Sequence, residues 1–161
     1  MYDIEHDEIL FKNEDFPVSI SGGLAVGSNY GRFHEQIEIK LVNSGEITVI
    51  LDTKAVNATE GEIIFVNPYE VHSNLCPDGQ EGIYTLFMLP LDFFDKVGIA
   101  GINLRKMIME EGIRFRNHIK NKEAADLLSK IAVQKIETEY ERLMFQVLYF
   151  NFLLFLFNPK P

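Results

Sequence analysis

The pattern of hydrophobic and polar positions changes near residue 91. Before that point, short runs rich in β-branched and aromatic residues alternate with turn signals. The runs cover residues 16–20, 37–42, 47–51, 63–66 and 83–89, and Ser21-Gly22-Gly23 and Asn43-Ser44-Gly45-Glu46 are two of the breaks. Short strands at this spacing predict an all-β sandwich or barrel over residues 1–90.

After Pro90 the pattern becomes helical. Residues 91–97 predict a short helix that Gly98 ends, and Asn121 is placed to cap a longer one. One face of that longer helix has apolar residues at three-to-four spacing, namely Ala124, Leu127, Leu128 and Ile131. A last helix is predicted from about Glu137 to Phe157, where Asn158-Pro159 ends it.

The last predicted helix is unusually apolar. Between Leu143 and Phe157, only Gln146 and Asn151 are neither apolar nor aromatic. The run is shorter than the ~20 residues that a membrane span needs, so we expect a helix buried on more than one side. A stripe with the spacing of a coiled-coil seam consists of Leu143, Val147, Phe150, Leu154 and Phe157. We expect this stripe to meet a second chain, and burial in the chain's own core is the alternative that the pattern leaves open.

Residues 32–41 predict a strand with one polar face. Its polar residues share one parity, and they are Arg32, His34, Gln36, Glu38 and Lys40. The other parity is apolar, with Phe33, Ile37, Ile39 and Leu41. Side chains alternate between the two faces of a strand, so the polar face either meets solvent or lines a wet pocket. Periodicity alone does not choose between these two interpretations.

Composition and charge narrow the classes of function. The 161 residues, 47% of them hydrophobic, are enough for one domain with its own core. The net charge of −9 opposes binding of nucleic acid by this segment, because phosphate contacts need a basic surface. The single cysteine, Cys76, excludes an internal disulfide and fits a reducing compartment. The N-terminus lacks the basic and apolar regions of a signal peptide, so we expect a cytoplasmic protein.

Two motifs resemble the signature stretches of a cupin barrel. The first cupin motif has the form His-x-His, three or four residues, Glu, six residues, Gly, and the corresponding residues here are Arg32, His34, Glu38 and Gly45. The second has the form Gly, five or six residues, Pro, then His, and the corresponding residues are Gly61, Pro68 and His72. The resemblance implies a mainly β chain, a double-stranded β-helix or jelly-roll barrel followed by C-terminal helices. It also implies that the motif side chains point into the barrel.

A closer resemblance is to the N-terminal sensor domain of AraC-type transcription regulators. It rests on HEQIEIKLVNSG at residues 34–45 and GEIIFVNPYEVHS at residues 61–73. The resemblance implies a small-molecule sensor over residues 1–90 and a helical segment over 91–161 that dimerises and leads to DNA-binding helix-turn-helix units. Those units are not in this sequence, so we expect the natural chain to continue past Pro161. The implied partners are a sugar or small anion and a second copy of the chain, with DNA bound only through the missing units and no membrane contact.

The motif residues also raise the question of a metal. His34, Glu38 and His72 can supply two imidazoles and a carboxylate, a set that suits Fe, Mn, Ni or Zn. Arg32 stands where a metallo-cupin has a further ligand, and a guanidinium cannot ligate a cation and repels it. We therefore expect no metal and no cofactor, and polar recognition of a ligand by Arg32, His34, Gln36, Glu38, Lys40 and His72. A histidine satisfied by backbone at a strand start is the structural alternative for His72.

Three functions remain open at this point. The first is a sensor and dimerisation domain without enzymatic activity. The second is a stand-alone metal-dependent cupin enzyme of the dioxygenase or sugar isomerase type, with a metal on His34, Glu38 and His72. The third is a dimeric structural module whose barrel is filled by its own side chains.

Overall fold

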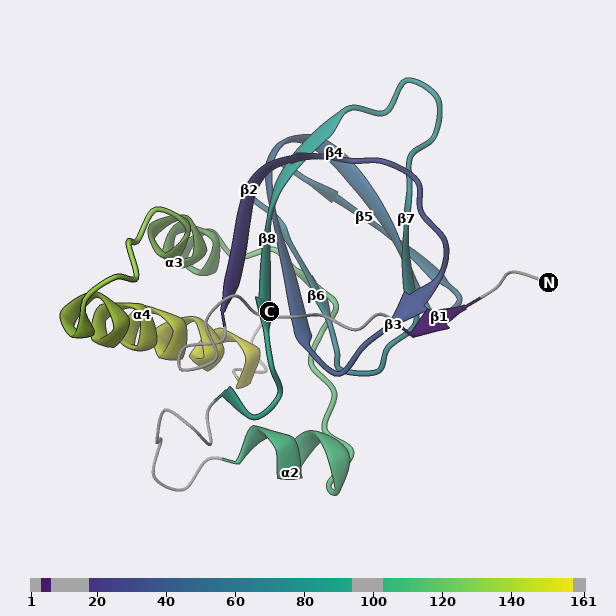
Figure 1. Cartoon of the computed structure of the whole chain (residues 1–161). Helices are drawn as coiled ribbons and strands as arrows, with labels where there is room; N and C mark the ends of the chain where they lie inside the picture. The colour runs from purple at the N-terminus through teal and green to yellow at the C-terminus, as the bar shows by residue number, and fades with distance from the viewer. Residues whose placement is uncertain (1–3, 7–17, 94–102, 158–161) are drawn as a thin grey trace.

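The structure is a computed structural model, and it describes residues 4–6, 18–93 and 103–157. The strands in this part of the chain are β1 (Glu5–His6), β2 (Ser19–Ala25), β3 (Arg32–Phe33), β4 (Ile37–Leu51), β5 (Lys54–Thr59), β6 (Ile63–Val66), β7 (His72–Leu75), β8 (Gly82–Leu89) and β9 (His118–Ile119). The helices are α2 (Leu104–Met109), α3 (Lys122–Ala132) and α4 (Glu139–Phe157). The strands curl into a barrel, with α3 and α4 on one side beside β2 and β8 (Figure 1). The predicted fold class, a mainly β jelly-roll barrel with C-terminal helices, is confirmed.

Strand β4 is the centre of the barrel because it pairs with four other strands. Its first half pairs with β6 and β8, and its second half pairs with β5 and β7. The turn predicted at residues 43–46 is wrong, because the two flanking runs form one strand with a register shift between Val42 and Ser44. Gly45 makes this possible: its φ of 70° bends the chain, and a Cβ there would collide with the carbonyl oxygen of Glu81.

The irregularity in β4 reverses the parity of the residues that face the barrel interior. Val42 lies before the shift, whereas Ile47, Val49 and Leu51 lie after it, and all four belong to one core cluster. One extra residue in a strand moves the alternation by one position, so even-numbered residues face inward before the shift and odd-numbered residues after it. Glu38 and Lys40 therefore share the inward face with Val42.

Other boundaries differ from the sequence prediction. The predicted break at Ser21-Gly22-Gly23 lies within β2, which continues through a bulge to Ala25. A turn at Asp52-Thr53 joins β4 to β5, a strand that was not predicted because most of its side chains are polar or small. The short strands β1, β7 and β9 and helix α2 were not predicted either. The single strand predicted over residues 32–41 is wrong, because residues 32 and 33 form β3, residues 34–36 lie outside any strand, and β4 begins at Ile37. Two predicted elements lie partly outside the described residues. These are the first strand, at residues 16 and 17, and the short helix, at residues 94–98.

The two longer helices agree with the sequence prediction. The side chain of Asn121 accepts a hydrogen bond from the backbone N–H of Ala124 at 3.0 Å and caps α3. Ala124, Leu128 and Ile131 are buried on the predicted face. Helix α4 begins two residues later than predicted. None of the helices in the described part of the chain is long and apolar enough to cross a membrane.

The barrel and the helices share one core. Ile37, Ile39 and Leu41 on the outer face of β4 belong to the same cluster as residues of α3 and α4, including Phe145 and Phe152. Helix α3 contacts β4, and α4 packs on α3. Strand β9, which lies beyond residue 91, pairs with β6. The functional division at residue 90 stays a prediction, since the two parts are continuous in both sheet and core.

Candidate functional site

The barrel interior holds a cluster of polar side chains. His34 precedes β4, Glu38 and Lys40 lie on β4, and His72 and Asn74 lie on β7. Each of the five is at most 7% exposed. His34, Gln36, Glu38 and Lys40 of the predicted polar face are therefore buried and do not meet solvent, whereas Arg32 is only half-buried.

The carboxylate of Glu38 is the centre of this cluster. Its Oε1 lies 2.8 Å from the Nζ of Lys40. Its Oε2 lies 3.2 Å from the Nε2 of His34 and 3.5 Å from the Nε2 of His72. Lys40 also donates a hydrogen bond of 2.7 Å to the Oδ1 of Asn74, and its Nζ lies 5.7 Å from the centre of the Tyr84 ring. One ammonium thus joins a carboxylate, an amide and an aromatic face.

Backbone carbonyls orient both imidazoles. The Nδ1 of His34 lies 3.2 Å from the carbonyl oxygen of Gln36, and the Nδ1 of His72 lies 2.9 Å from that of Glu70. A carbonyl only accepts hydrogen bonds, so each Nδ1 carries a proton and each Nε2 faces Glu38. His72 therefore makes the backbone contact expected of a structural histidine at a strand start. Its second ring nitrogen, Nε2, still faces the cluster.

The ionisation of Glu38 follows from its surroundings. Burial alone would raise the pKa of this carboxyl group, because it penalises the charged form. The charge of Lys40, followed by the contacts with His34 and His72, outweighs burial and holds the pKa well below its ordinary value. Glu38 and Lys40 are therefore a carboxylate and an ammonium, a buried ion pair.

The residues of the second motif form the turn that places His72. Gly61 has a φ of 80° in the turn before β6. After β6, the backbone N–H of Asn67 donates to the Oε2 of Glu70 at 2.9 Å and closes the Asn-Pro-Tyr-Glu turn. The backbone N–H of Tyr69 donates to the carbonyl oxygen of His34 at 2.7 Å. This turn therefore fixes the start of β7 relative to the start of β4, and both histidines with it.

The remaining predicted residues lie at the edge of the cluster. Arg32 is half-buried on β3, with its Cα opposite that of His72. Gln36 is 6% exposed, and its carbonyl oxygen receives the His34 contact. The sequence did not point to Asn74 and Tyr84. Asn74 shares the inward parity of His72 two residues earlier, which was a usable signal, whereas no pattern marks Tyr84 among the other buried aromatic residues.

The cluster meets the geometric condition for a metal ion but not the electrostatic one. The ligand atoms of His34, Glu38 and His72 lie within 4.8 Å of one another. However, the carboxylate that would bind the metal already pairs with the ammonium of Lys40. A divalent cation on the same carboxylate would stand beside that ammonium in a medium that screens charge poorly. The residues present therefore do not fit a metal while Lys40 is charged.

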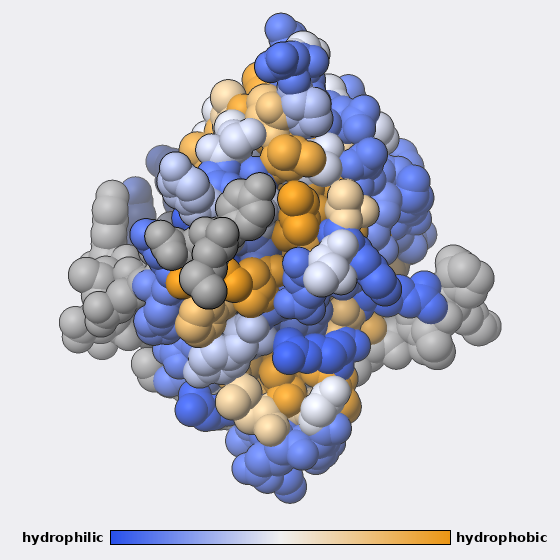
Figure 2. Space-filling view, turned by 90° about the vertical axis from the view of Figure 1, so that its right-hand side faces the viewer, coloured by the Kyte–Doolittle hydropathy of each residue, from blue (hydrophilic) through white to orange (hydrophobic). Residues whose placement is uncertain are grey.

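Helix α4 carries the second candidate site, an apolar surface. Three residues of the predicted stripe are exposed, Leu143 by 55%, Val147 by 45% and Leu154 by 65%. Phe150 is half-buried and packs against the core. The side chain of Phe157 is not among those that the structure describes. The opposite face is buried through Phe145, Tyr149, Phe152 and Leu153. The helix is therefore apolar on two sides, only one of which packs on its own chain. By contrast, the barrel face beside β1, β3 and β7 is mostly hydrophilic, with a narrow strip of apolar residues (Figure 2).

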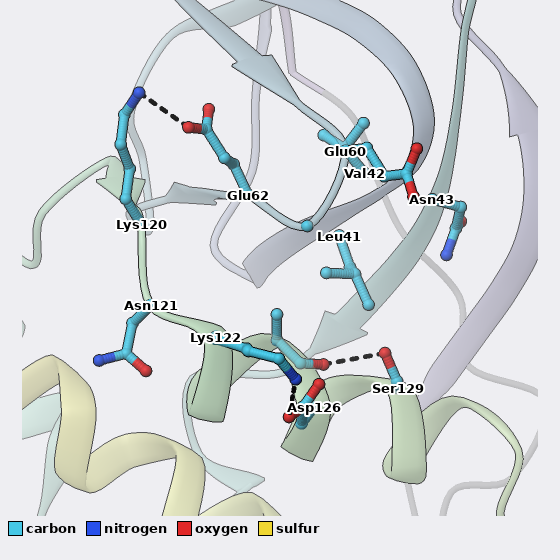
Figure 3. Close-up of a pocket in the computed structure, with 12 residues that line it drawn as sticks. Leu41, Val42, Asn43, Glu60, Glu62, Lys120, Asn121, Lys122, Asp126 and Ser129 are labelled. Carbon is cyan, nitrogen blue, oxygen red and sulfur yellow. Dashed lines mark hydrogen bonds and ion pairs between the residues drawn. The ribbon is translucent and has the colours of Figure 1, made fainter.

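A pocket of about 490 Å³ lies between the outer wall of the barrel and the start of α3 (Figure 3). Leu41 on the outer face of β4 gives it an apolar wall, and the sequence did not predict this pocket. Two lysines line it, and both form ion pairs: Lys120 with Glu62 at 2.7 Å and Lys122 with Asp126 at 2.8 Å. These ion pairs involve lysines that are largely exposed to solvent, whereas the ion pair of the barrel cluster is buried, so the buried cluster remains the stronger candidate for a ligand site.

Comparison with known proteins supports the fold. No protein-family model and no curated protein matches the sequence. Among solved structures, apo ToxT from Vibrio cholerae, a regulator of the AraC family, matches 89% of this chain with a TM-score of 0.52 at 13% identity. The match takes in 56% of the ToxT chain, so this chain spans a little over half of that protein. At this identity the likeness concerns the fold alone, and it includes both the barrel and the helices.

Two further solved structures match the barrel. An RmlC-like cupin from Shewanella frigidimarina matches 45% of this chain and 66% of its own, with a TM-score of 0.36 and 23% identity. A Cupin 2 conserved barrel domain protein from Salinispora arenicola matches 55% of this chain and 76% of its own, with a TM-score of 0.39 and 14% identity. These TM-scores are too low to carry an argument. The jelly-roll barrel rests on the strand pairing of this chain, and the fuller match to ToxT shows a solved fold that covers both the barrel and the helices.

Proposed function

We propose that the chain is the ligand-sensing and dimerisation part of an AraC-type transcription regulator, without enzymatic activity of its own. A small polar molecule binds among Arg32, His34, Glu38 and His72 inside the barrel. The exposed stripe of α4 forms a homodimer, and the DNA-binding units lie in a segment that this sequence does not include. The likeness of the fold to ToxT over both barrel and helices supports this proposal.

One observation carries the proposal: a single strand links the buried cluster to the helices. The inner face of β4 bears Glu38 and Lys40, and its outer face bears Ile37, Ile39 and Leu41. That outer face shares a core with α3 and α4, and α3 contacts both β4 and α4. Because packed cores transmit small displacements, a ligand that shifts β4 also shifts the helix that bears the stripe.

A binding screen tests the sensor role. Monosaccharides, small carboxylates and phosphate esters are screened for compounds that raise the thermal midpoint of residues 1–161, since a ligand of the folded state stabilises it. The best compound is then titrated into the wild type and Arg32→Ala. We expect weaker binding by the variant with an unchanged circular dichroism spectrum, since Arg32 lies at the edge of the cluster. Equal binding by both proteins, or no stabilising compound in any class, would count against a sensor of polar molecules.

Light scattering tests the dimer. A wild-type dimer is expected, and Leu154→Glu should convert it to monomer because a charge at the centre of an apolar seam is costly to bury. Val133→Glu is a matched control, since Val133 is also apolar and exposed, by 81%, but lies at the end of α3 and not on α4. A monomeric wild type at high concentration, or a Leu154→Glu protein that remains dimeric, would contradict this role of the stripe.

The second candidate function is a small metal-dependent cupin enzyme. One observation favours it, the convergence of two imidazole Nε2 atoms on the carboxylate of Glu38. The buried ammonium of Lys40 opposes it. Elemental analysis of protein purified without chelators separates the two candidates, and about one Fe, Mn, Ni or Zn ion per chain would favour the enzyme.

A further inference from the structure

The buried cluster has the donor geometry of a metal site, yet a lysine holds its carboxylate. Each histidine uses Nδ1 for a backbone carbonyl and turns Nε2 toward Glu38. Metal-binding histidines typically show this division of roles, because the bond at one nitrogen fixes the ring for coordination at the other. The three donors are therefore oriented before any ion arrives.

Lys40 lies where it can replace the charge of a metal. Its Nζ is 2.8 Å from the Oε1 of Glu38, and the residue is 2% exposed. The hydrogen bond to Asn74 at 2.7 Å and the Tyr84 ring at 5.7 Å hold the ammonium in place. The neighbouring cross-strand residues of Glu38 and Lys40 on β6 and β8 are apolar: Ile64, Val66, Leu86 and Met88.

The charge of the cluster depends on which cation is present. Glu38 and Lys40 together are neutral, so a divalent ion added to them would leave a net charge of +2 in an apolar lining, with Arg32 nearby. Without the ammonium, the same ion beside Glu38 would leave a net charge of +1. Because charge is costly in such surroundings, the ammonium and the metal compete for one carboxylate.

We propose that Lys40 is an internal cation that keeps His34, Glu38 and His72 from binding a divalent metal, so that the wild-type barrel is a metal-free polar site. The proposal assigns the exclusion to Lys40 and not to Arg32, although Arg32 occupies the position of a cupin ligand, because the Nζ of Lys40 lies 2.8 Å from the carboxylate. The inference does not depend on the regulatory role, since it concerns only the cluster within this chain.

Zinc titration of tag-free residues 1–161 tests the proposal. Binding is measured by isothermal calorimetry, and the thermal midpoint is compared with and without Zn²⁺. We expect no binding by the wild type at micromolar zinc. Lys40→Met, which keeps the length of the side chain without its charge, should bind one zinc ion at least about 100-fold more tightly. Zinc should also raise the thermal midpoint of this variant and leave that of the wild type unchanged.

Three further variants make the result specific. Lys40→Met combined with His34→Gln should lose the gain, since one ligand is removed. Lys120→Met is the control at the surface, where Glu62 contacts Lys120 and His118. It should bind no zinc, because one imidazole and one carboxylate are too few ligands for a tight site. Arg32→His should also stay weak, since Lys40 remains in place. Tight binding by Arg32→His together with none by Lys40→Met would overturn the proposal and assign the exclusion to Arg32.

The proposal can be tested even if Lys40→Met does not fold without metal. If Lys40→Met is unfolded without metal, zinc-dependent recovery of its circular dichroism spectrum supports the proposal, because metal binding and folding are then coupled. Lys40→Gln is the second variant, and it keeps a hydrogen-bond donor without the charge. Failure of both variants to fold or bind with zinc present would overturn the proposal, as would one tightly bound zinc per wild-type chain. The latter result would leave the α4 dimer untouched, because light scattering tests the dimer separately.

Discussion

The protein contains two clusters built from the same three residue types in different surroundings. Inside the barrel, Glu38 meets Lys40 and two histidines, and the side chains of the ion pair are 2% and 6% exposed. On the outside, Glu62 meets Lys120 at 2.7 Å and His118 at 2.8 Å, and Lys120 is 67% exposed. The distances between lysine and glutamate are nearly equal, so the geometry of the ion pair does not distinguish the clusters.

Solvent access makes the two clusters physically different. Water screens the outer pair and can replace either partner, so its net contribution to stability is small. The inner pair has lost its water, so each charge depends on the other. A cluster of this second kind can select among ligands, because an entering charge must be matched there. The inner cluster is therefore the candidate for recognition, and the outer cluster has a local structural role.

Removing one lysine from each cluster should separate them most clearly. Lys40→Met leaves a buried carboxylate without its main partner and should lower the free energy of unfolding by about 3–5 kcal/mol. Lys120→Met should lower it by about 0–1 kcal/mol, because solvent replaces the ammonium. Urea denaturation in metal-free buffer measures both. Similar losses from the two substitutions would show that the clusters do not differ in the way that burial implies.

Removing both charges should sharpen the comparison. Glu38→Gln combined with Lys40→Met should be about 2 kcal/mol more stable than Lys40→Met alone, because no uncompensated buried charge remains. Glu62→Gln combined with Lys120→Met should show little recovery over Lys120→Met. The two double-mutant cycles give these coupling energies directly. A larger coupling energy in the outer cluster than in the inner one would reverse the account.

Acid titration should reveal the smaller contribution of the outer cluster. Burial alone would raise the pKa of Glu62, but Lys120, the backbone of Thr59 and His118 together lower it from 4.5 to about 2. A lowered pKa stabilises the folded state above the ordinary value, and the effect is lost as the pH falls through the folded value. The wild type should therefore exceed Glu62→Gln by about 1 kcal/mol near neutral pH, after allowance for screening by solvent.

The measurement for Glu62 compares unfolding free energies of wild type and Glu62→Gln from pH 6 downward. The difference should decline between pH 4.5 and pH 2, the interval between the ordinary and the folded pKa. Subtracting the variant removes the effect of other acidic groups that titrate in the same range. A difference that stays constant over this interval would contradict the lowered pKa of Glu62.

The sequence predicted which residues come together inside the barrel better than it predicted the strands around them. The parity of residues 32–40 marked a polar face, and the cupin motifs selected His34 and Glu38 from it and added His72 from a later strand. Two facts lay beyond the pattern. The bond between Lys40 and Asn74 joins residues that are distant in sequence, and Lys40 and Arg32 share the parity of Glu38, so alternation cannot tell which cation reaches the carboxylate.

The prediction of two strands separated by a turn at residues 43–46 failed, because the backbone there continues as one strand despite its turn-like composition. The sequence around Gly45 has the composition of a turn, but here it belongs to one long strand with a bulge between Val42 and Ser44. Which outcome occurs depends on the chain just before β8, where the carbonyl oxygen of Glu81 lies too close to Gly45 for a Cβ. In α4, spacing correctly placed Leu143, Val147 and Leu154 on one exposed face, because helical periodicity is a local property.

The central claim is that the barrel cluster and the α4 stripe act as one unit. Analytical ultracentrifugation of residues 1–161, with and without the most stabilising compound from the screen, tests it directly. If β4 couples the two sites, saturation with that compound should change the dimer dissociation constant by at least about fivefold, and Arg32→Ala should reduce the change. A dissociation constant that stays the same with the barrel saturated would contradict the account.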